Sequence, residues 1–189
     1  MKRYLALLLF VSITTLAFAQ ESHQDKNGSS LKSTSLQFGY KGIVEMGYQF
    51  GVGNYGMDRL KLNAIISDQI NPYFSFGLGM GFRYYIDAEA VAVSPLADFK
   101  INITNNNVSP YLSLGVGYSF DTSNGLEGMG ILFNPTVGIS FRVSGKSVIN
   151  VGIGYEMQQV KFYYYNYGYN YQNFTENSSA ISIVIGIHQ

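Results

Sequence analysis

The chain has 189 residues with 12 basic and 12 acidic side chains, 13% charged and 15% aromatic residues, and no cysteine. The charged share is about half of the ~25% usual in soluble proteins, whereas the 47% apolar share excludes a disordered chain. The lack of cysteine excludes disulfides, thiolate metal sites and lipid attachment to cysteine. The balanced charge argues against nucleic acid as a partner, because nucleic-acid binding needs a basic face.

The first twenty residues, MKRYLALLLFVSITTLAFAQ, have the organisation of a secretory signal peptide. Lys2 and Arg3 precede an apolar stretch over 5–16, and Ala17-Phe18-Ala19 supplies the small residues of a cleavage site. We predict a signal peptide over 1–19, since the apolar stretch is short for a membrane anchor of about 20 residues. Removing Lys2 and Arg3 leaves 10 basic residues against 12 acidic ones. Residues 20–37 are polar without a period, which predicts a flexible periplasmic lead-in.

From residue 40 onward, apolar and polar residues alternate, which predicts strands with two unlike faces. The predicted strands are 40–50, 58–68, 73–86, 91–103, 110–120, 129–143, 147–162 and 179–188. Each is near or above the about 9–11 residues that a tilted membrane strand needs. The connections alternate between short turns, as at 69–73, and longer loops, as at 51–58 and 163–177. Short turns on one rim and long loops on the other are typical of outer-membrane barrels, with both termini on the periplasmic side.

A weak internal repeat supports this arrangement. The stretch NPYFSFGLGMGF (71–82) recurs as SPYLSLGVGYSF (109–120), with a fainter copy at 147–157. A repeat of this length could mark a propeller blade. It holds about two strands rather than four, however, so we interpret it as a repeated hairpin.

The two faces of the strands differ in side-chain size. In FSFGLGMGF (74–82), large apolar residues alternate with Gly77, Gly79 and Gly81, and the other strands repeat this contrast. The interior of an eight-stranded barrel is only just wide enough for side chains, so inward glycines leave room for long charged residues. We predict that the apolar face meets lipid and that paired charges plug the lumen. The predicted lumen charge network is Glu45, Lys61, Arg83, Asp98, Lys100, Arg142 and Glu156.

The alternative is a soluble lipocalin-like barrel with the apolar face inside. Glycine and serine would make a poor solvating surface, and large apolar side chains at every inward position would overfill the lumen. The predicted fold is therefore all-β, an eight-stranded antiparallel up-and-down transmembrane β-barrel over 38–189.

Several stretches together resemble the outer-membrane protein beta-barrel domain family of Gram-negative bacteria. They are YGMDRLKLNAI (55–65), INPYFSFGLGMGF (70–82), VSPYLSLGVGYSF (108–120), FNPTVGISF (133–141) and INVGIGYEMQ (149–158). The chain is more distantly similar to small barrels of the OmpA/OmpX kind. The resemblance implies an outer-membrane barrel of largely uncharacterised role, without catalytic residues. Such barrels commonly end on an aromatic residue that the insertion machinery reads, whereas this chain ends Ile187-His188-Gln189. This departure bears on the efficiency of insertion more than on the fold.

The sequence contains stretches that are similar to cofactor-binding or catalytic motifs, but a structural interpretation fits them better. GLGMG (77–81) is similar to a dinucleotide-binding loop, but it lies within a strand and no helix follows, so we interpret it as lumen packing. Barrel enzymes typically pair a histidine with serine or aspartate near the outer leaflet. His23 lies in the lead-in and His188 at the periplasmic rim. We therefore expect no enzyme, cofactor or metal site, although chemistry by Asp, Glu, Lys or Tyr alone stays open.

The segment before the last strand is rich in aromatic residues, which favour recognition surfaces. Its candidate contact residues are Tyr163, Tyr164, Tyr165, Tyr167, Tyr169, Tyr171 and Phe174. They fit either an aromatic girdle with strand extension or a contact surface for an extracellular protein or glycan. We predict a monomeric outer-membrane protein with a structural or surface-interaction role, surrounded by membrane lipid and lipopolysaccharide and inserted by the barrel machinery. The alternative function is a small-solute channel or transporter.

Overall fold

The computed structural model describes residues 40–188 except 124, 145–146 and 166–170. The predicted signal peptide over 1–19 and lead-in over 20–37 lie outside the described residues, as does Gln189. Their assignment therefore remains a prediction. No helix in the described part of the chain is long and apolar enough to cross a membrane.

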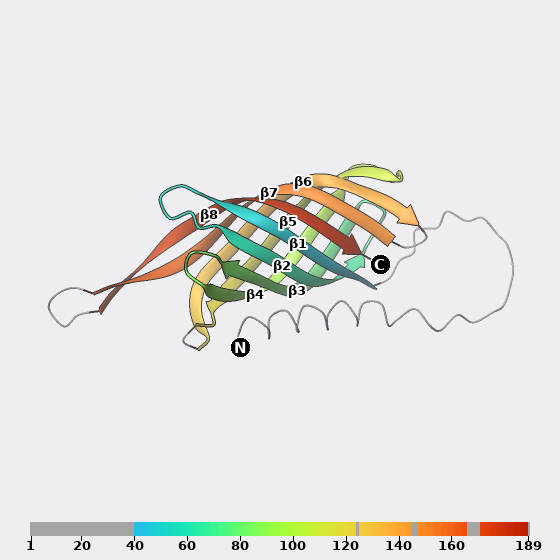
Figure 1. Ribbon diagram of the computed structural model, residues 1–189. Helices are drawn as coiled ribbons and strands as arrows, with labels where there is room; N and C mark the ends of the chain where they lie inside the picture. Colours follow the sequence, from blue (N-terminus) through green and yellow to red (C-terminus); the bar gives the residue numbers. More distant parts are fainter. Residues whose placement is uncertain (1–39, 124, 145–146, 166–170, 189) are drawn as a thin grey trace, which may run out of the picture. The chain divides into compact units, whose positions relative to one another are not determined.

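The described residues form a closed barrel of antiparallel strands (Figure 1). The strands are β1 (Tyr40–Val52), β2 (Arg59–Gln69), β3 (Phe74–Tyr85), β4 (Ala90–Asn102), β5 (Val108–Asp121), β6 (Glu127–Ser144), β7 (Ser147–Tyr165) and β8 (Tyr171–His188). Each strand pairs with its sequence neighbours, and β1 pairs with β8 to close the sheet. This confirms the predicted eight-stranded up-and-down barrel. We call the end with the connections 53–58, 86–89 and 122–126 the loop end, and the end with 70–73 and 103–107 the turn end.

The strand bounds agree with the predicted ones within two residues except in the last hairpin. There β7 continues to Tyr165, and β8 begins at Tyr171 instead of residue 179. The β7–β8 register runs without a break from Val148–His188 to Tyr165–Tyr171. The prediction was wrong here because 171–178 is mostly polar and carries no alternation that could indicate a strand.

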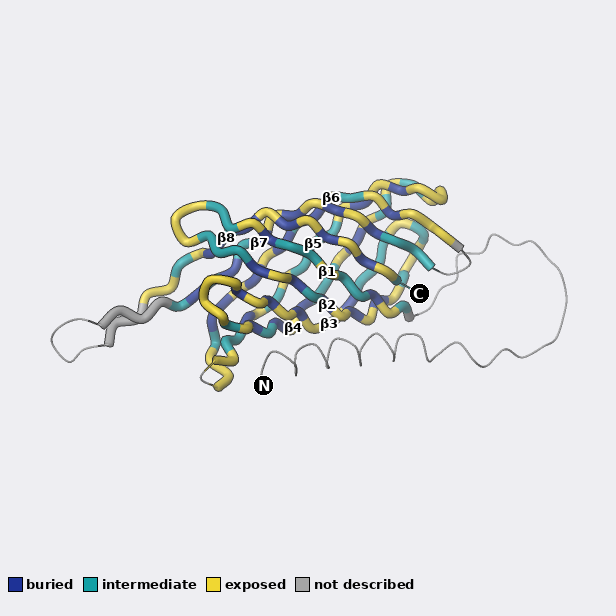
Figure 2. The backbone as a smooth tube through the Cα atoms, viewed as in Figure 1, coloured by how far each residue is buried: buried dark blue, intermediate teal, exposed yellow. Residues whose placement is uncertain are grey.

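Inward and outward residues alternate along the strands, as Figure 2 shows by the alternation of buried and exposed positions. Apolar residues form two small inner clusters. One contains Tyr85, Ala92, Met129 and Val160, with Met57 packed against it, and lies toward the loop end. The other contains Ile43, Ile65 and Leu96. Much of the remaining inner face is polar or glycine, so polar contacts fill a large part of the lumen.

Two prolines, Pro95 in β4 and Pro135 in β6, interrupt the backbone register with the following strand. Proline has no N–H to donate to a ladder, so it weakens the seam at that point. Beside Pro135, the Asn134 side chain donates a hydrogen bond of 2.8 Å to Glu156 on β7. A side-chain contact inside the lumen thus joins β6 and β7 where the backbone register is interrupted.

Candidate functional site

The centre of the lumen is organised around the carboxylate of Glu156. This residue lies on β7 and is fully buried. Arg83, on β3 and also fully buried, donates from Nε to Oε1 at 3.0 Å and from Nη2 to Oε2 at 2.8 Å. This bidentate geometry is the strongest arrangement of an arginine–carboxylate pair. Because β3 and β7 are four strands apart in either direction, the pair crosses the barrel interior.

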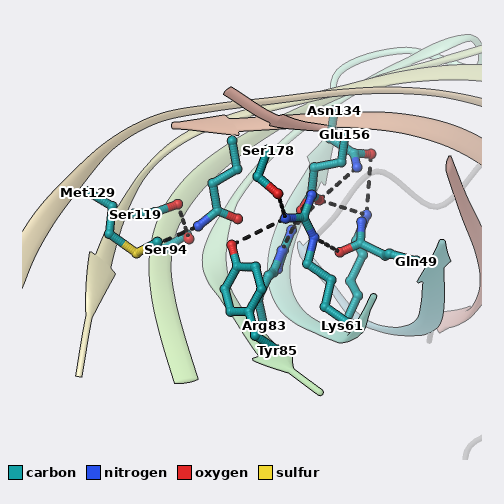
Figure 3. Close-up of polar contacts among 12 residues, drawn as sticks. Gln49, Lys61, Arg83, Tyr85, Ser94, Ser119, Met129, Asn134, Glu156 and Ser178 are labelled. Carbon is teal, nitrogen blue, oxygen red and sulfur yellow. Dashed lines mark hydrogen bonds and ion pairs between the residues drawn. The ribbon is translucent and has the colours of Figure 1, made fainter. Parts of the chain in front are cut away.

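Two further cations approach the same carboxylate, as Figure 3 shows for Lys61. Lys61 Nζ lies 3.8 Å from Oε2 of Glu156, and Arg59 Nη2 lies 3.7 Å from Oε1. Lys61 also donates to Asn134 Oδ1 at 3.3 Å. One buried carboxylate therefore faces three buried cations, an arrangement that is tolerated only when the charges are paired.

A second layer of charges lies beside this centre. The Asn63 side chain donates to Glu45 at 3.1 Å and accepts from Arg83 Nη1 at 2.8 Å, so it links the two layers. Glu45 and Asp98 line a cavity of about 10 Å³ together with Lys61 and Arg83. This is space for about one water molecule. The cavity is far too small for a solute.

Toward the turn end, Lys100 and Tyr111 fill the lumen. Lys100 Nζ donates to Asn150 Oδ1 at 2.8 Å and lies 4.1 Å from the centre of the Tyr111 ring, within cation–π range. A Cβ on Gly138 would lie 2.6 Å from Tyr111 Cε1, and one on Gly152 would lie 2.5 Å from Tyr111 Oη. These inward glycines therefore leave space for the large Tyr111 side chain from a neighbouring strand.

The structure brings most, but not all, of the predicted charge network together. Glu45, Lys61, Arg83, Asp98, Lys100 and Glu156 all line the lumen. Arg142 continues the inward series of β6, but its side chain is exposed at the turn end, and its backbone N–H donates to Asn107 O at 2.8 Å. The structure therefore does not place Arg142 in the central network, because β6 reaches the mouth of the barrel before this residue.

Sequence reasoning missed Arg59 and its partners. Arg59 begins β2, is fully buried, and donates to Gln49 at 3.0 Å and to Tyr85 at 3.2 Å. The sequence does indicate the inward position of Arg59, because it lies two residues before Lys61 and hence on the same face of the strand.

The aromatic hairpin is described only in part. Tyr163, Tyr164 and Tyr165 lie in β7 and Tyr171 lies in β8, where Tyr165 pairs with Tyr171. Tyr167 and Tyr169 lie outside the described residues. The described backbone supports strand extension at this hairpin.

Phe174, on the same hairpin, contacts the neighbouring loop. Its side chain is 41% exposed, and its ring centre lies 6.5 Å from that of Tyr55 in the 53–58 loop. The base of the hairpin thus packs against the β1–β2 connection.

The outer face of the barrel carries large exposed apolar side chains on every strand. On β3 the outward apolar side chains run from Phe74 to Tyr84, ten residues apart; Phe74 is half-buried, and Leu78, Met80, Phe82 and Tyr84 are exposed. At about 3.3 Å per residue and a tilt near 40°, this stretch is roughly 25 Å tall. That is the height of the apolar band of an outer-membrane barrel.

Aromatic rings border this apolar band at both ends of the barrel. Tyr84, Tyr118 and Tyr155 are exposed toward the loop end. Tyr73 and Phe99 are exposed toward the turn end. Two such girdles mark the membrane–water interfaces of a transmembrane barrel.

The described histidine and acidic side chains were compared with the requirements of a metal centre. His188 lies at the turn end of β8, and His23 is outside the described residues. Within the described ranges, no group of three or more histidine, aspartate or glutamate side chains is placed to hold a metal ion.

No protein-family model and no curated protein matches the chain. Among solved structures, Neisserial surface protein A (NspA) is similar with a TM-score of 0.59 and 14% identity, over 79% of this chain and 95% of that one. The outer-membrane protein AlkL is similar with a TM-score of 0.54 and 9% identity, over 87% of this chain and 95% of that one.

The N-terminal β-barrel domain of Pseudomonas aeruginosa OprF is similar with a TM-score of 0.51 and 11% identity, over 81% of this chain and all of that one. These likenesses confirm the predicted OmpA/OmpX-like architecture at the level of the fold. The chain has the fold of a small eight-stranded outer-membrane β-barrel.

Proposed function

We propose that this chain is a surface-interaction protein of the outer membrane, in which a closed barrel anchors the β7–β8 hairpin outside the cell. The observation that carries the proposal is the combination of a filled lumen with one hairpin that extends past the rest of the barrel. The apolar outer face and its two aromatic girdles support a location in the lipid bilayer.

The filled lumen argues for anchoring rather than transport. Arg83 and Glu156 meet across the interior, and Lys100 packs over Tyr111 between this centre and the turn end. The apolar cluster around Tyr85 and Met129 lies toward the loop end. A solute would have to displace all three layers, and the cavity beside Glu45 holds about one water molecule.

The hairpin supports the contact role through its length. The register of β6 with β7 ends at Gln158, and that of β1 with β8 ends at Ser179. The β7–β8 register continues to Tyr165–Tyr171, so a two-stranded ribbon extends beyond both neighbouring ladders, as Figure 1 shows. Its high tyrosine content favours recognition, because tyrosine offers a large contact area at low entropic cost. We propose an extracellular protein or glycan as the partner of this hairpin.

Single-cysteine labelling tests the orientation that this proposal requires, because the chain has no cysteine of its own. Thr175 is exposed on the hairpin, and Asn106 is exposed in a turn at the opposite end of the barrel. In intact cells, a membrane-impermeant maleimide should label Thr175→Cys and should leave Asn106→Cys unlabelled until the outer membrane is permeabilised. The reverse pattern would contradict the proposal.

Binding assays test the contact role itself. Cells that express the wild-type chain should bind to arrays of extracellular proteins or glycans more strongly than cells that express Tyr163→Ser/Tyr165→Ser/Tyr171→Ser. Tyr73→Ser, which changes a tyrosine at the turn end, is the matched control and should bind as the wild type does. Equal binding by all three strains, with equal surface levels, would leave the barrel as a structural component only.

A further inference from the structure

The described part of the lumen contains more positive than negative side chains. The buried cations are Arg59, Lys61, Arg83 and Lys100, none more than 6% exposed. The lumen carboxylates are Glu156, which is buried, and Glu45 and Asp98, which are half-buried. These four buried cations outnumber the three carboxylates even when every carboxylate is ionised, and half-buried Lys41 adds a further positive charge at the turn end. Buried charges are tolerated when they are paired, so an anion from outside the chain would balance this excess.

Among these four buried cations, Arg59 has a side-chain nitrogen without a hydrogen-bond partner. Arg83 makes the two short contacts with Glu156, whereas Arg59 Nη2 is 3.7 Å from that carboxylate, too far for a hydrogen bond. The other nitrogens of Arg59 donate to neutral oxygens, including Ser178 Oγ at 3.2 Å. Nη2 itself is buried and has no hydrogen-bond acceptor in the described part of the chain.

Two more polar atoms without partners lie in the same row as Arg59. They are Gln49 Nε2 and Ser182 Oγ, which are buried and have no hydrogen-bond partner among the described residues. Gln49 pairs with Arg59 on β2 and with Ser182 on β8, so the three residues stand side by side on adjacent strands. All three are 0% exposed. Buried polar groups nearly always have partners, so three potential donors in one row indicate a ligand that accepts hydrogen bonds.

We propose that the lumen binds one monovalent anion, a halide such as chloride, between Arg59, Gln49 and Ser182. A halide accepts hydrogen bonds from several directions and brings no proton that would itself need an acceptor. Its negative charge would offset part of the excess positive charge of the lumen. A water molecule would satisfy some of these donors, but it carries no charge to offset the cations that outnumber the lumen carboxylates.

Bromide serves as the probe, because it replaces chloride and can be located by its anomalous X-ray scattering. The full-length mature protein is folded into detergent micelles in sodium bromide and crystallised. We expect an anomalous peak within contact distance of Arg59 Nη2 and Gln49 Nε2. An ordered scatterer there without anomalous signal, bromide only elsewhere, or no scatterer at all would overturn the proposal.

Unfolding measurements give a second test that does not depend on crystals. Protein folded in chloride should have a higher urea midpoint than protein folded in gluconate at equal ionic strength. Ser182→Ala and Arg59→Gln should lose at least half of this difference. Ser119→Ala is the matched control, since Ser119 is equally buried but hydrogen-bonds Ser94 at 2.7 Å, and it should keep the full difference. If Arg59→Gln fails to fold, Ser182→Ala decides alone, and equal midpoints of the wild type in both salts would refute the site.

Discussion

Arg83 on β3 and Glu156 on β7 form a bidentate ion pair across the inside of the barrel, with contacts of 3.0 and 2.8 Å. The two strands are diametrically opposed in the closed sheet, so this pair fixes the separation of opposite walls. Both side chains are 0% exposed. A contact of this kind explains how a narrow barrel is filled without a large apolar core.

Replacing Glu156 should destabilise the barrel strongly. Glu156→Gln would leave Arg59, Lys61 and Arg83 without the carboxylate that they share, and an uncompensated buried charge costs about 3–5 kcal/mol. Arg83→Met should lower the free energy of unfolding by less, because Arg59 and Lys61 would still face the Glu156 carboxylate. Urea unfolding in detergent measures both changes in the free energy of unfolding.

The matched control for this series is Glu176→Gln, which removes a carboxylate from β8 outside the lumen charge network. We expect the urea unfolding midpoint of this variant to stay close to that of the wild type. If Glu156→Gln were as stable as this control, the central network would not hold the barrel together.

Adding one methyl group to the inner face should have opposite results at two glycines. At Gly138, a Cβ would collide with the Val151 carbonyl oxygen and lie 2.6 Å from the Tyr111 ring, so Gly138→Ala should cost about 1–3 kcal/mol by overpacking. At Gly115, the nearest atom would be 3.7 Å away, which is an ordinary contact, so Gly115→Ala should be tolerated. Unfolding midpoints of the two variants compare them directly. If both variants lost the same amount of stability, backbone effects would explain these glycines, and not the space that they leave for side chains.

The β1–β2 loop should lose its order in acid. The Asp58 carboxylate accepts hydrogen bonds of 2.8 Å from the Gly51 N–H and the Tyr48 hydroxyl. The Gly51 amide first, and the Tyr48 hydroxyl second, hold the pKa of Asp58 below its usual value. A lowered pKa means that these bonds stabilise the loop fully above the ordinary aspartate pKa of about 3.9 and are lost as the pH falls through the lowered value.

The amide resonance of Gly51 reports this transition in NMR spectra recorded in micelles. We expect it to stay constant above about pH 5, given the ordinary aspartate pKa, and to shift only in strong acid. In Asp58→Asn the acid transition should disappear. A Gly51 shift centred near neutral pH would contradict the assignment to Asp58.

Planar-bilayer recordings distinguish the sealed barrel from the channel alternative. The three side-chain layers predict no steady conductance for the wild type, since the cavity of about 10 Å³ admits only about one water molecule. A channel would instead show regular conductance steps that change in Arg83→Ala, Lys100→Ala or Glu156→Ala. Such conductance steps would contradict the proposed anchoring role and support a transport function.

Much of this architecture could be predicted from alternation alone. A period of two, with glycines on one face of each strand and large apolar residues on the other, predicts that Lys61, Arg83 and Glu156 point into the lumen. The pattern could not indicate which of them meet, because this depends on the stagger between strands that are distant in sequence. The Arg83–Glu156 pair joins residues 73 positions apart.

Two features of the structure were not predicted. Arg59 shares the inward face of Lys61 by its spacing, but it stands at the start of β2, next to the loop, so its full burial depends on the closed barrel around it. The polar stretch 171–178 becomes a strand because β7 supplies its hydrogen-bond partners, not because it has an apolar face.

The most direct test of the central claim is gel electrophoresis of the outer-membrane fraction of expressing cells, with and without boiling. A closed barrel resists detergent until it is heated, so the protein should be in this fraction, and its band should shift on boiling. A soluble periplasmic protein whose band does not shift would contradict the membrane barrel, and the exposed apolar face would then need another explanation.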